Sequence, residues 1–434
     1  MELLVLLEYF IATAIRFWLS KSDYNKLLAD RVEISTPLNS WKRVTEGAAL
    51  YNVGTSPYLG DMFHDNPLWL IAFNWMLRNV PQYITYIFIF SDMITAHLLF
   101  LTARKFVGNL LTKQINEQKN YAKVSRQLLV SPEDVRMAPI FVVTAYLFNP
   151  YTVLTCAAHA TTVFANLFLA IMLYATVKGH ILICCLALAL SAQQAMYTVI
   201  LIVPICMYLA QGKTNKTLFM AMIATIFSTI LCGLIYLSYR IVGSWDFIYA
   251  TYGFILTVPD LRPNIGLFWY FFTEMFEHFR VLFLCAFQMN AAVLYLGPLA
   301  FRLHAEPMLL ATSLITLIAI FKSYPALGDV GFYLALLPMW KHLFHYMQQG
   351  FIVSCFFIIT SVLGPTVWHL WIYNRSANAN FYFGVTLAFA TAQIFLVTDL
   401  LFAYIKREYA VMHGLPRTID GKEAKLVLES SNFE

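Results

Sequence analysis

Residues 351–372 read FIVSCFFIITSVLGPTVWHLWI, and none of them is Asp, Glu, Lys or Arg. A helix rises about 1.5 Å per residue, so this stretch would extend about 33 Å as a helix. The hydrocarbon core of a bilayer is about 30 Å thick. The stretch therefore predicts a membrane-spanning helix, and it sets the class of the whole fold.

The rest of the chain has the same character. Its 434 residues are 60% hydrophobic and 12% charged, whereas a soluble globular protein carries about 25% charged residues. Further spans are predicted at 3–19, 81–103, 138–149, 153–177, 179–194, 195–210, 217–239, 266–300, 306–321, 329–345 and 380–404. We therefore expect an all-α fold, a polytopic transmembrane helical bundle of about 12 spans in a single integral membrane domain, residues 1–434. The run 266–300 is long enough for one tilted helix, or for an interfacial helix followed by a span.

The basic residues predict the orientation. Six Lys and Arg residues fall between positions 104 and 126, and cytoplasmic loops carry such an excess. We expect loop 104–137 and tail 405–434 to be cytosolic, with both termini on that side, and loop 20–80 to be lumenal.

The first span is expected to be a retained helix, because it lacks the basic n-region of a signal peptide. The seven cysteines lie in apolar segments without CxxC spacing, so we expect thiols that pack as small hydrophobes.

Residues 271–279, FFTEMFEHF, place ionisable groups in an apolar run. Glu274, Glu277 and His278 are spaced i, i+3, i+4, so a helix would present them on one face. Such groups usually face the protein interior or a wet cavity, although they also occur at membrane edges. A metal site is not expected, because no second Glu-x-x-His motif accompanies them.

Two junctions between apolar runs are rich in polar residues. The first, FKSYPALGDVGFYLALLP (321–338), offers Lys322, Tyr324 and Asp329. The second, LWIYNRSANANFYF (370–383), offers Asn374, Arg375, Asn378 and Asn380. Amides and an Arg at a membrane boundary suit phosphate or sugar hydroxyls. They equally suit a capped turn, with Ser376 or Asn378 as the N-cap of the last helix.

The acidic residues of the lumenal loop 20–80 indicate whether the chain could be a glycosyltransferase. A glycosyltransferase that uses a lipid-linked sugar needs a carboxylate beside the reacting sugar, often in a DxD or ExD motif. The acids of the loop are Asp23, Asp30, Glu33, Glu46, Asp61 and Asp65, and none has that spacing. Neither a G-x-S-x-G elbow nor a Walker A loop is present. A mannosyltransferase that uses dolichyl-phosphate-mannose remains the alternative. A transporter or flippase is a third reading, but broken-helix repeats are not visible.

Several segments resemble the PIG-U family. They are ISTPLNSWKRVTEG (34–47), SPYLGDMFHDNPL (56–68), LFNPYTVLTC (147–156), SWDFIYATYGFILTVPDLRPNIGLFWYFFTEMFEHF (244–279), IAIFKSYPALGDVGFY (318–333), WHLWIYNRSANANFYF (368–383) and REYAVMHGL (407–415). They run from end to end of the chain, so the resemblance covers essentially all of it.

The resemblance implies a non-catalytic, multi-pass subunit of the glycosylphosphatidylinositol (GPI) transamidase complex in the endoplasmic reticulum membrane. The family's fold is similar to that of lipid-linked-sugar mannosyltransferases, without their catalytic acids. The complex removes a C-terminal signal from a precursor and attaches GPI to the new carboxyl end. Implied partners are the catalytic cysteine-protease-like subunit, accessory subunits, the GPI lipid and the precursor's signal, with no cofactor. The subunit would help to recognise or present GPI, or the precursor's hydrophobic tail, and the polar residues named above are the candidate contacts for GPI or for assembly.

Overall fold

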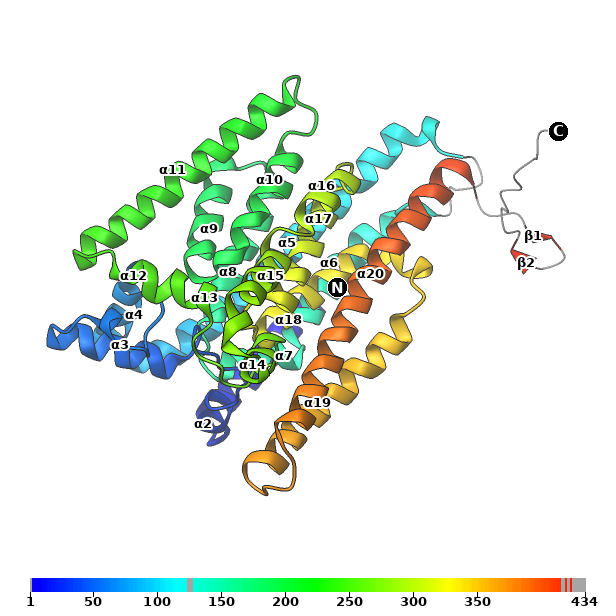
Figure 1. Ribbon diagram of the computed structural model, residues 1–434. Coiled ribbons are helices and arrows are strands. Elements are labelled where there is room, and N and C mark those ends of the chain that lie inside the picture. Colours follow the sequence, from blue (N-terminus) through cyan, green and yellow to red (C-terminus); the bar gives the residue numbers. More distant parts are fainter. Residues whose placement is uncertain (1, 123–127, 415–417, 420–421, 424–434) are drawn as a thin grey trace.

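The computed structural model describes residues 2–122, 128–414, 418–419 and 422–423. Within these ranges the regular secondary structure is helical, apart from two short antiparallel strands, β1 (Thr418–Ile419) and β2 (Lys422–Glu423). The helices form one bundle of long and short rods, with α11 along one edge and the α19–α20 pair along another (Figure 1). The predicted all-α class is confirmed for the described residues.

Six helical segments in the described part of the chain are long and apolar enough to cross a membrane. They are α1 (Glu2–Lys21), η2 with α5 (Pro81–Tyr83, Ile84–Glu117), α11 (Lys216–Val242), η7 with α15 and α16 (Glu277–Phe279, Arg280–Ala292, Leu296–Arg302), α19 (Gly350–Ile372) and α20 (Ala379–His413). A bent pair, α6 (Pro132–Leu147) and α7 (Pro150–Ala157), makes a seventh if it counts as one span; the two helices meet at 47°. The predicted number of about twelve is therefore not confirmed.

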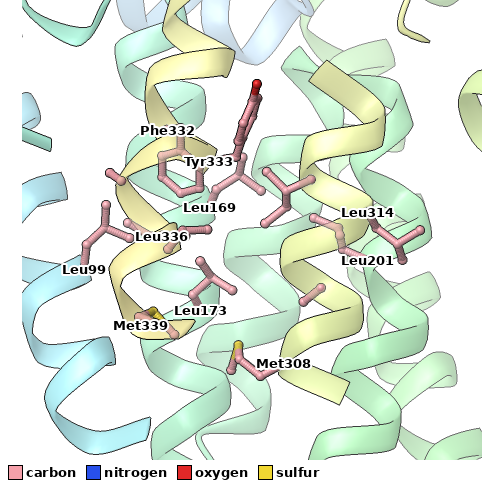
Figure 2. Close-up of a cluster of buried hydrophobic side chains, with 14 of the residues drawn as sticks. Leu99, Leu169, Leu173, Leu201, Met308, Leu314, Phe332, Tyr333, Leu336 and Met339 are labelled. Atoms are coloured by element: carbon pink, nitrogen blue, oxygen red, sulfur yellow. The ribbon is translucent and has the colours of Figure 1, made fainter. Parts of the chain in front are cut away.

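Shorter apolar helices fill the centre of the bundle. They are α8 (Thr162–Lys178), α9 (Ile181–Gln194), η5 with α10 (Met196–Leu201, Ile202–Leu209), α17 (Pro307–Phe321), and α18 with η8 (Leu327–Leu336, Leu337–Tyr346). Leu169 of α8, Leu314 of α17 and Leu336 of α18 are buried together (Figure 2). A helix that is apolar on all sides belongs in such an interior, which is why α17 is buried along nearly its whole length.

A buried ion pair joins the first helix to this core. Arg16 of α1 is 0% exposed. Its Nε donates to an Asp92 carboxylate oxygen at 2.6 Å, and its Nη1 donates to the Leu147 carbonyl at 2.8 Å. The Tyr146 hydroxyl donates to the other Asp92 oxygen at 2.6 Å. The guanidinium thus also satisfies a carbonyl at the end of α6, where the chain bends into α7.

The remaining helices gather at one end of the bundle, together with the turn between α19 and α20 (Figure 1). They are α2 (Tyr24–Ala29), α3 (Trp41–Val53), η1 (Pro57–Leu59), α4 (Pro67–Asn79), α12 (Asp246–Ile248), η6 (Tyr249–Gly253), α13 (Phe254–Thr257) and α14 (Phe268–Glu274). We call this the α3 end. At the opposite end η3 (Gln118–Asn120) follows α5.

Two predicted spans are divided in the structure. The stretch 153–177 breaks after Ala157, because His159 adopts a φ of 53° and the Thr161 amide donates to the Asn39 carbonyl at 3.0 Å. The run 266–300 is not one helix either. It contains the short α14, an extended step at Met275 and Phe276, and then the long helical segment from Glu277. The alternative of one tilted helix is therefore wrong, and the order of a short helix before a long one is the order that the other alternative, an interfacial helix followed by a span, requires.

The cysteines only partly follow the prediction. All seven are free thiols, and Cys156, Cys184, Cys185 and Cys206 are buried. Cys232 of α11 and Cys285 of α15 are instead exposed on outward helix faces. The helix faces of α11 and α15 that carry these two cysteines are therefore on the outer surface of the bundle.

Candidate functional site

The FFTEMFEHF segment does not form the predicted polar helix face. Helix α14 ends at Glu274, and the 3₁₀ turn η7 begins only at Glu277. Glu274, Glu277 and His278 are all exposed. The break lets Met275 pack against the buried aromatic cluster around Phe268, while the ionisable side chains avoid the cost of burial. The predicted i, i+3, i+4 geometry is wrong, because Glu274 is the last residue of α14 whereas Glu277 and His278 lie in η7, and all three side chains are exposed.

The junction at 321–338 is an internally paired cluster. Lys322 and Asp329 form an ion pair at 2.6 Å, and Asp329 also accepts the Ala326 amide at the start of α18. The buried Tyr324 hydroxyl donates to the Asp260 carbonyl at 3.0 Å. Burial raises the pKa of Tyr324, so this phenol stays protonated. Lys322, Tyr324 and Asp329 line a small pocket of about 40 Å³ together with Gln194.

The junction at 370–383 forms the turn between α19 and α20. Asn378 is the N-cap of α20, and its side chain accepts from the Phe381 amide at 3.2 Å. Asn380 accepts a short hydrogen bond from the Tyr270 hydroxyl. Arg375 is exposed and has a φ of 55°, and Asn374 beside it is exposed as well. The capping alternative is thus confirmed for Asn378. Asn378 and Asn380 also line an open groove of about 660 Å³ between α19 and α20.

The sequence did not predict a second, more enclosed space near this turn. A cavity of about 350 Å³ lies between α2, α7 and the α19–α20 pair. Its lining is mostly apolar and comprises Leu27, Leu28, Arg31, Glu33, Ile34, Pro150, Tyr151, Leu154, Ile265, Leu327, Thr360, Ser361, Gly364, Pro365, Tyr382, Val385, Thr386 and Phe389. We call it the α19–α20 cavity. Cavities of about 300–1,000 Å³ with apolar walls and a few polar groups are typical of small-molecule sites.

Polar groups occupy one part of this cavity. Arg31 binds Glu33 through two hydrogen bonds, from Nε at 3.1 Å and from Nη2 at 2.9 Å. The two side chains are only 16% and 9% exposed. Tyr382 of α20 is 0% exposed and lies near the Glu33 carboxylate. The sequence analysis names Glu33 only as one of the acids of loop 20–80. The contact of residues 31–33 with Tyr382 could not be predicted, because the two segments are far apart in the sequence.

Within the described part of the chain, no three His, Cys, Asp or Glu side chains lie close enough together to hold a metal ion.

Comparison with known proteins shows extensive similarity. The family model of PIG-U, described as GPI transamidase subunit PIG-U, matches residues 10–389. The human GPI-anchor transamidase component PIGU is 41% identical over 430 residues, covering 96% of this chain and 98% of the human protein. The GPI transamidase component GAB1 of Saccharomyces cerevisiae is 29% identical over 392 residues, covering 90% of both chains. The GAB1 homolog of Schizosaccharomyces pombe is 29% identical over 419 residues, covering 96% of this chain and 97% of that protein.

Proposed function

Because the chain belongs to the PIG-U family of GPI transamidase subunits, we propose that it is a non-catalytic membrane subunit of the GPI transamidase complex. In this role it helps to recognise or present the GPI lipid, or the precursor's hydrophobic tail, for attachment of GPI to the C-terminus of proteins. Its partners are the catalytic cysteine-protease-like subunit and the accessory subunits of that complex.

The α19–α20 cavity is the observation that carries this proposal. It is a mostly apolar space beside a membrane-crossing helix pair, with its charged groups confined to Arg31 and Glu33. A site that holds a lipid, or an apolar peptide, needs an apolar wall and a few polar groups that fix the orientation of the ligand. The exposed Glu274, Glu277 and His278 then serve as assembly or headgroup contacts, as do Arg375 and Asn374 at the α19–α20 turn.

The proposal includes a place in the cell. The protein lies in the endoplasmic reticulum membrane with its α3 end, and loop 20–80 within it, in the lumen. The basic loop 104–137, tail 405–434 and both termini lie in the cytosol. The shorter apolar helices, with the bent α6–α7 pair and the α18–η8 segment, bring the number of spans to about twelve. The bundle then resembles the lipid-linked-sugar mannosyltransferase fold.

Two of the acids of loop 20–80 are held in ion pairs. Asp30 forms an ion pair with Lys42, and Glu33 forms one with Arg31. Asp65 is buried without a side-chain hydrogen bond in the described residues. A general base needs a carboxylate within reach of the proton that it removes, and Asp30 and Glu33 are instead engaged by basic partners.

Cells that lack the chain test the proposal. They should accumulate unprocessed GPI-precursor proteins while complete GPI still forms, measured by immunoblotting and by analysis of labelled GPI lipids. An accumulation of GPI intermediates that lack a mannose would instead support the mannosyltransferase alternative and overturn the proposal. Alanine at Asp23, a loop acid outside the cavity lining, provides a second comparison, because a mannosyltransferase that used this acid would lose activity and a scaffold would keep it.

A further inference from the structure

The membrane-crossing segment Glu277–Arg302 has the least support from the rest of the chain. Among the six such segments in the described residues it has the smallest buried share, 6% of its most apolar part. The 21 residues between Arg280 and Arg302 include no Asp, Glu, Lys, Arg or His. As a helix they would extend about 32 Å, and the hydrocarbon core of a bilayer is about 30 Å thick. The stretch therefore fits the hydrocarbon layer from end to end.

The helix is broken inside this stretch. Helix α15 ends at Ala292, and α16 begins at Leu296. In an unbroken helix each amide donates to the carbonyl four residues earlier. The Leu296 amide donates instead to the Val293 carbonyl at 3.1 Å, and Pro298 has no amide hydrogen to give to the Leu294 carbonyl. The carbonyls of Ala292 and Leu294 therefore lack a hydrogen bond of standard geometry within the described residues.

Asn290 places a polar side chain just before the break. The residue is half-buried, and its side chain makes no hydrogen bond in the part of the chain that the structure describes. The nearby Gln288 side chain, in contrast, donates to the Ile255 carbonyl at 2.9 Å and to the Ser323 hydroxyl at 3.1 Å. Two residues are about 200° apart around a helix, so Asn290 lies on the side of α15 away from these partners.

The break lies on the outer surface of the bundle. Val293 and Leu294 are 58% and 55% exposed, and Pro298 is exposed as well. Irregular backbone at membrane depth occurs only where protein covers it or where it lines a water-filled cavity. Hydrocarbon chains supply no hydrogen-bond donor, and the apolar side chains around the break do not make the polar wall of a water-filled cavity. The break therefore requires a protein element that covers it.

We propose that the outer surface formed by Asn290, Val293, Leu294 and Gly297 docks one transmembrane helix of another subunit, with a Ser, Thr, Asn or Gln side chain of that helix hydrogen-bonded to the Asn290 amide. We call this surface the α15–α16 face. The inference rests on the proposed function, and it names the surface and the chemistry of the partner. Hydroxyl and amide side chains join helices in membranes, and small residues let two backbones approach. Gly297 has no atom within 4 Å of its Cβ position, so the partner has room there.

Other occupants match the α15–α16 face less well. A lipid acyl chain would leave the Asn290 amide and the free carbonyls without partners. A partner helix with an ionised side chain at this depth would find no counter-charge, because the stretch between Arg280 and Arg302 has none. A second copy of this chain would bring another Asn290, and the identity of a crosslinked product separates that case from a different subunit.

The test places the photoreactive amino acid benzoylphenylalanine at Val293 of the full chain, in cells that lack the endogenous protein. After irradiation, mass spectrometry identifies the crosslinked product. We expect an adduct with a transmembrane segment of another transamidase subunit, at a point within one helical turn of a Ser, Thr, Asn or Gln. Adducts with lipid alone, or with a second copy of this chain, would overturn the inference.

Two variants sharpen the result. Asn290→Leu removes the amide at similar volume, so the yield of the adduct should fall about fivefold, the effect of one hydrogen bond between membrane helices. The melting temperature of the purified full-length subunit should not fall, because Asn290 has no partner within it; a fall would indicate a structural role instead and contradict the inference. Met289→Leu, at the adjacent position, is 56% exposed in the wild type and is the matched control, with an unchanged yield.

The inference and the proposed function fail in different ways. If cells without the chain accumulate unprocessed precursors but the probe at Val293 reacts with lipid alone, the proposed function stands and the docking surface does not. If the adduct forms and is lost in Asn290→Leu, while cells without the chain accumulate GPI intermediates that lack a mannose, the surface stands and the proposed function is wrong. An equal yield in Asn290→Leu and the wild type would refute the amide contact in either case.

Discussion

Some ionisable side chains of this protein are buried, and burial changes their pKa values. In the α3 end, His64 and Asp65 follow each other and are both buried. Burial lowers the pKa of His64 and raises the pKa of the Asp65 carboxyl to about 7. The two shifts share one cause, because a low-dielectric environment disfavours the charged form of either group. Burial therefore shifts both residues toward the neutral form in the folded protein.

Asp65 makes the stability of the protein depend on pH. Its folded pKa lies above the unfolded value of 3.8, so its contribution to stability is fully present below that value and is lost as the pH rises through about 7. The variant Asp65→Asn should remove this dependence. Its melting temperature should rise relative to that of the wild type as the pH increases from 5 to 8, as measured by intrinsic fluorescence in detergent. Asp30→Asn, at an exposed carboxylate, is the control, and a pH-independent difference between Asp65→Asn and wild type would contradict the prediction.

At the scale of helices, close packing in the core depends on two glycines of α18. A Cβ at Gly331 would lie 2.7 Å from a Thr152 methyl and 3.2 Å from the Thr152 backbone nitrogen. One at Gly328 would lie 2.8 Å from the Thr155 methyl. The absence of side chains lets α18 approach α7 closely, as small residues do between membrane helices.

The variant Gly331→Ala should lower the free energy of unfolding by about 1–3 kcal/mol, the usual cost of overpacking, because the neighbouring backbone cannot move aside as a side chain would. Thermal unfolding of the purified protein measures the effect. Gly384→Ala in α20 is the matched control, since no atom lies within 4 Å of its Cβ position. There the better helix propensity of Ala should leave stability unchanged or raise it by about 0.5–1 kcal/mol. Equal effects at the two glycines would refute the packing argument.

Some helices could be predicted from the sequence and others could not. The stretches 217–239, 351–372 and 380–404 were predicted because length and apolarity alone define them, and α11, α19 and α20 contain them. The break at Met275 was missed because the i, i+3, i+4 spacing fits a helix, while packing of Met275 against a distant aromatic cluster decides the outcome. The α19–α20 cavity was missed because Arg31 and Tyr382 come from opposite ends of the chain and meet only through tertiary packing.

At the scale of the whole molecule, apolar helices form the outer surface. Leu218 of α11, Val281 of α15 and Phe351 of α19 are 69%, 73% and 82% exposed. Exposed apolar surface of this extent marks a membrane or a protein partner. A multi-pass membrane protein within a larger complex requires both kinds of contact.

The proposed orientation predicts which positions a reagent reaches in sealed microsomes. Lys119→Cys lies in the exposed η3, and Gly60→Cys lies in the α3 end at an exposed position with open space for a side chain. Both would be made in a protein that carries Cys232→Ser and Cys285→Ser, which removes the exposed thiols. A membrane-impermeant maleimide should label Lys119→Cys directly, and Gly60→Cys only after detergent is added. The reverse pattern would invert the proposed topology.

The Arg16–Asp92 pair also constrains biosynthesis. Helix α1 leaves the ribosome first, and its guanidinium has no counter-charge until Asp92 of α5 has been translated 76 residues later. An arginine at the centre of a lone membrane helix costs about 2.5–3.5 kcal/mol in translocon insertion, and Arg16, which lies nearer the C-terminal end of α1, carries a smaller cost of the same kind. We therefore expect the first helix to be stabilised in the bilayer only when the second membrane-crossing segment, which contains α5, has been made. Nascent chains that stop short of Asp92 are expected to release α1 from the bilayer and to become substrates for quality control.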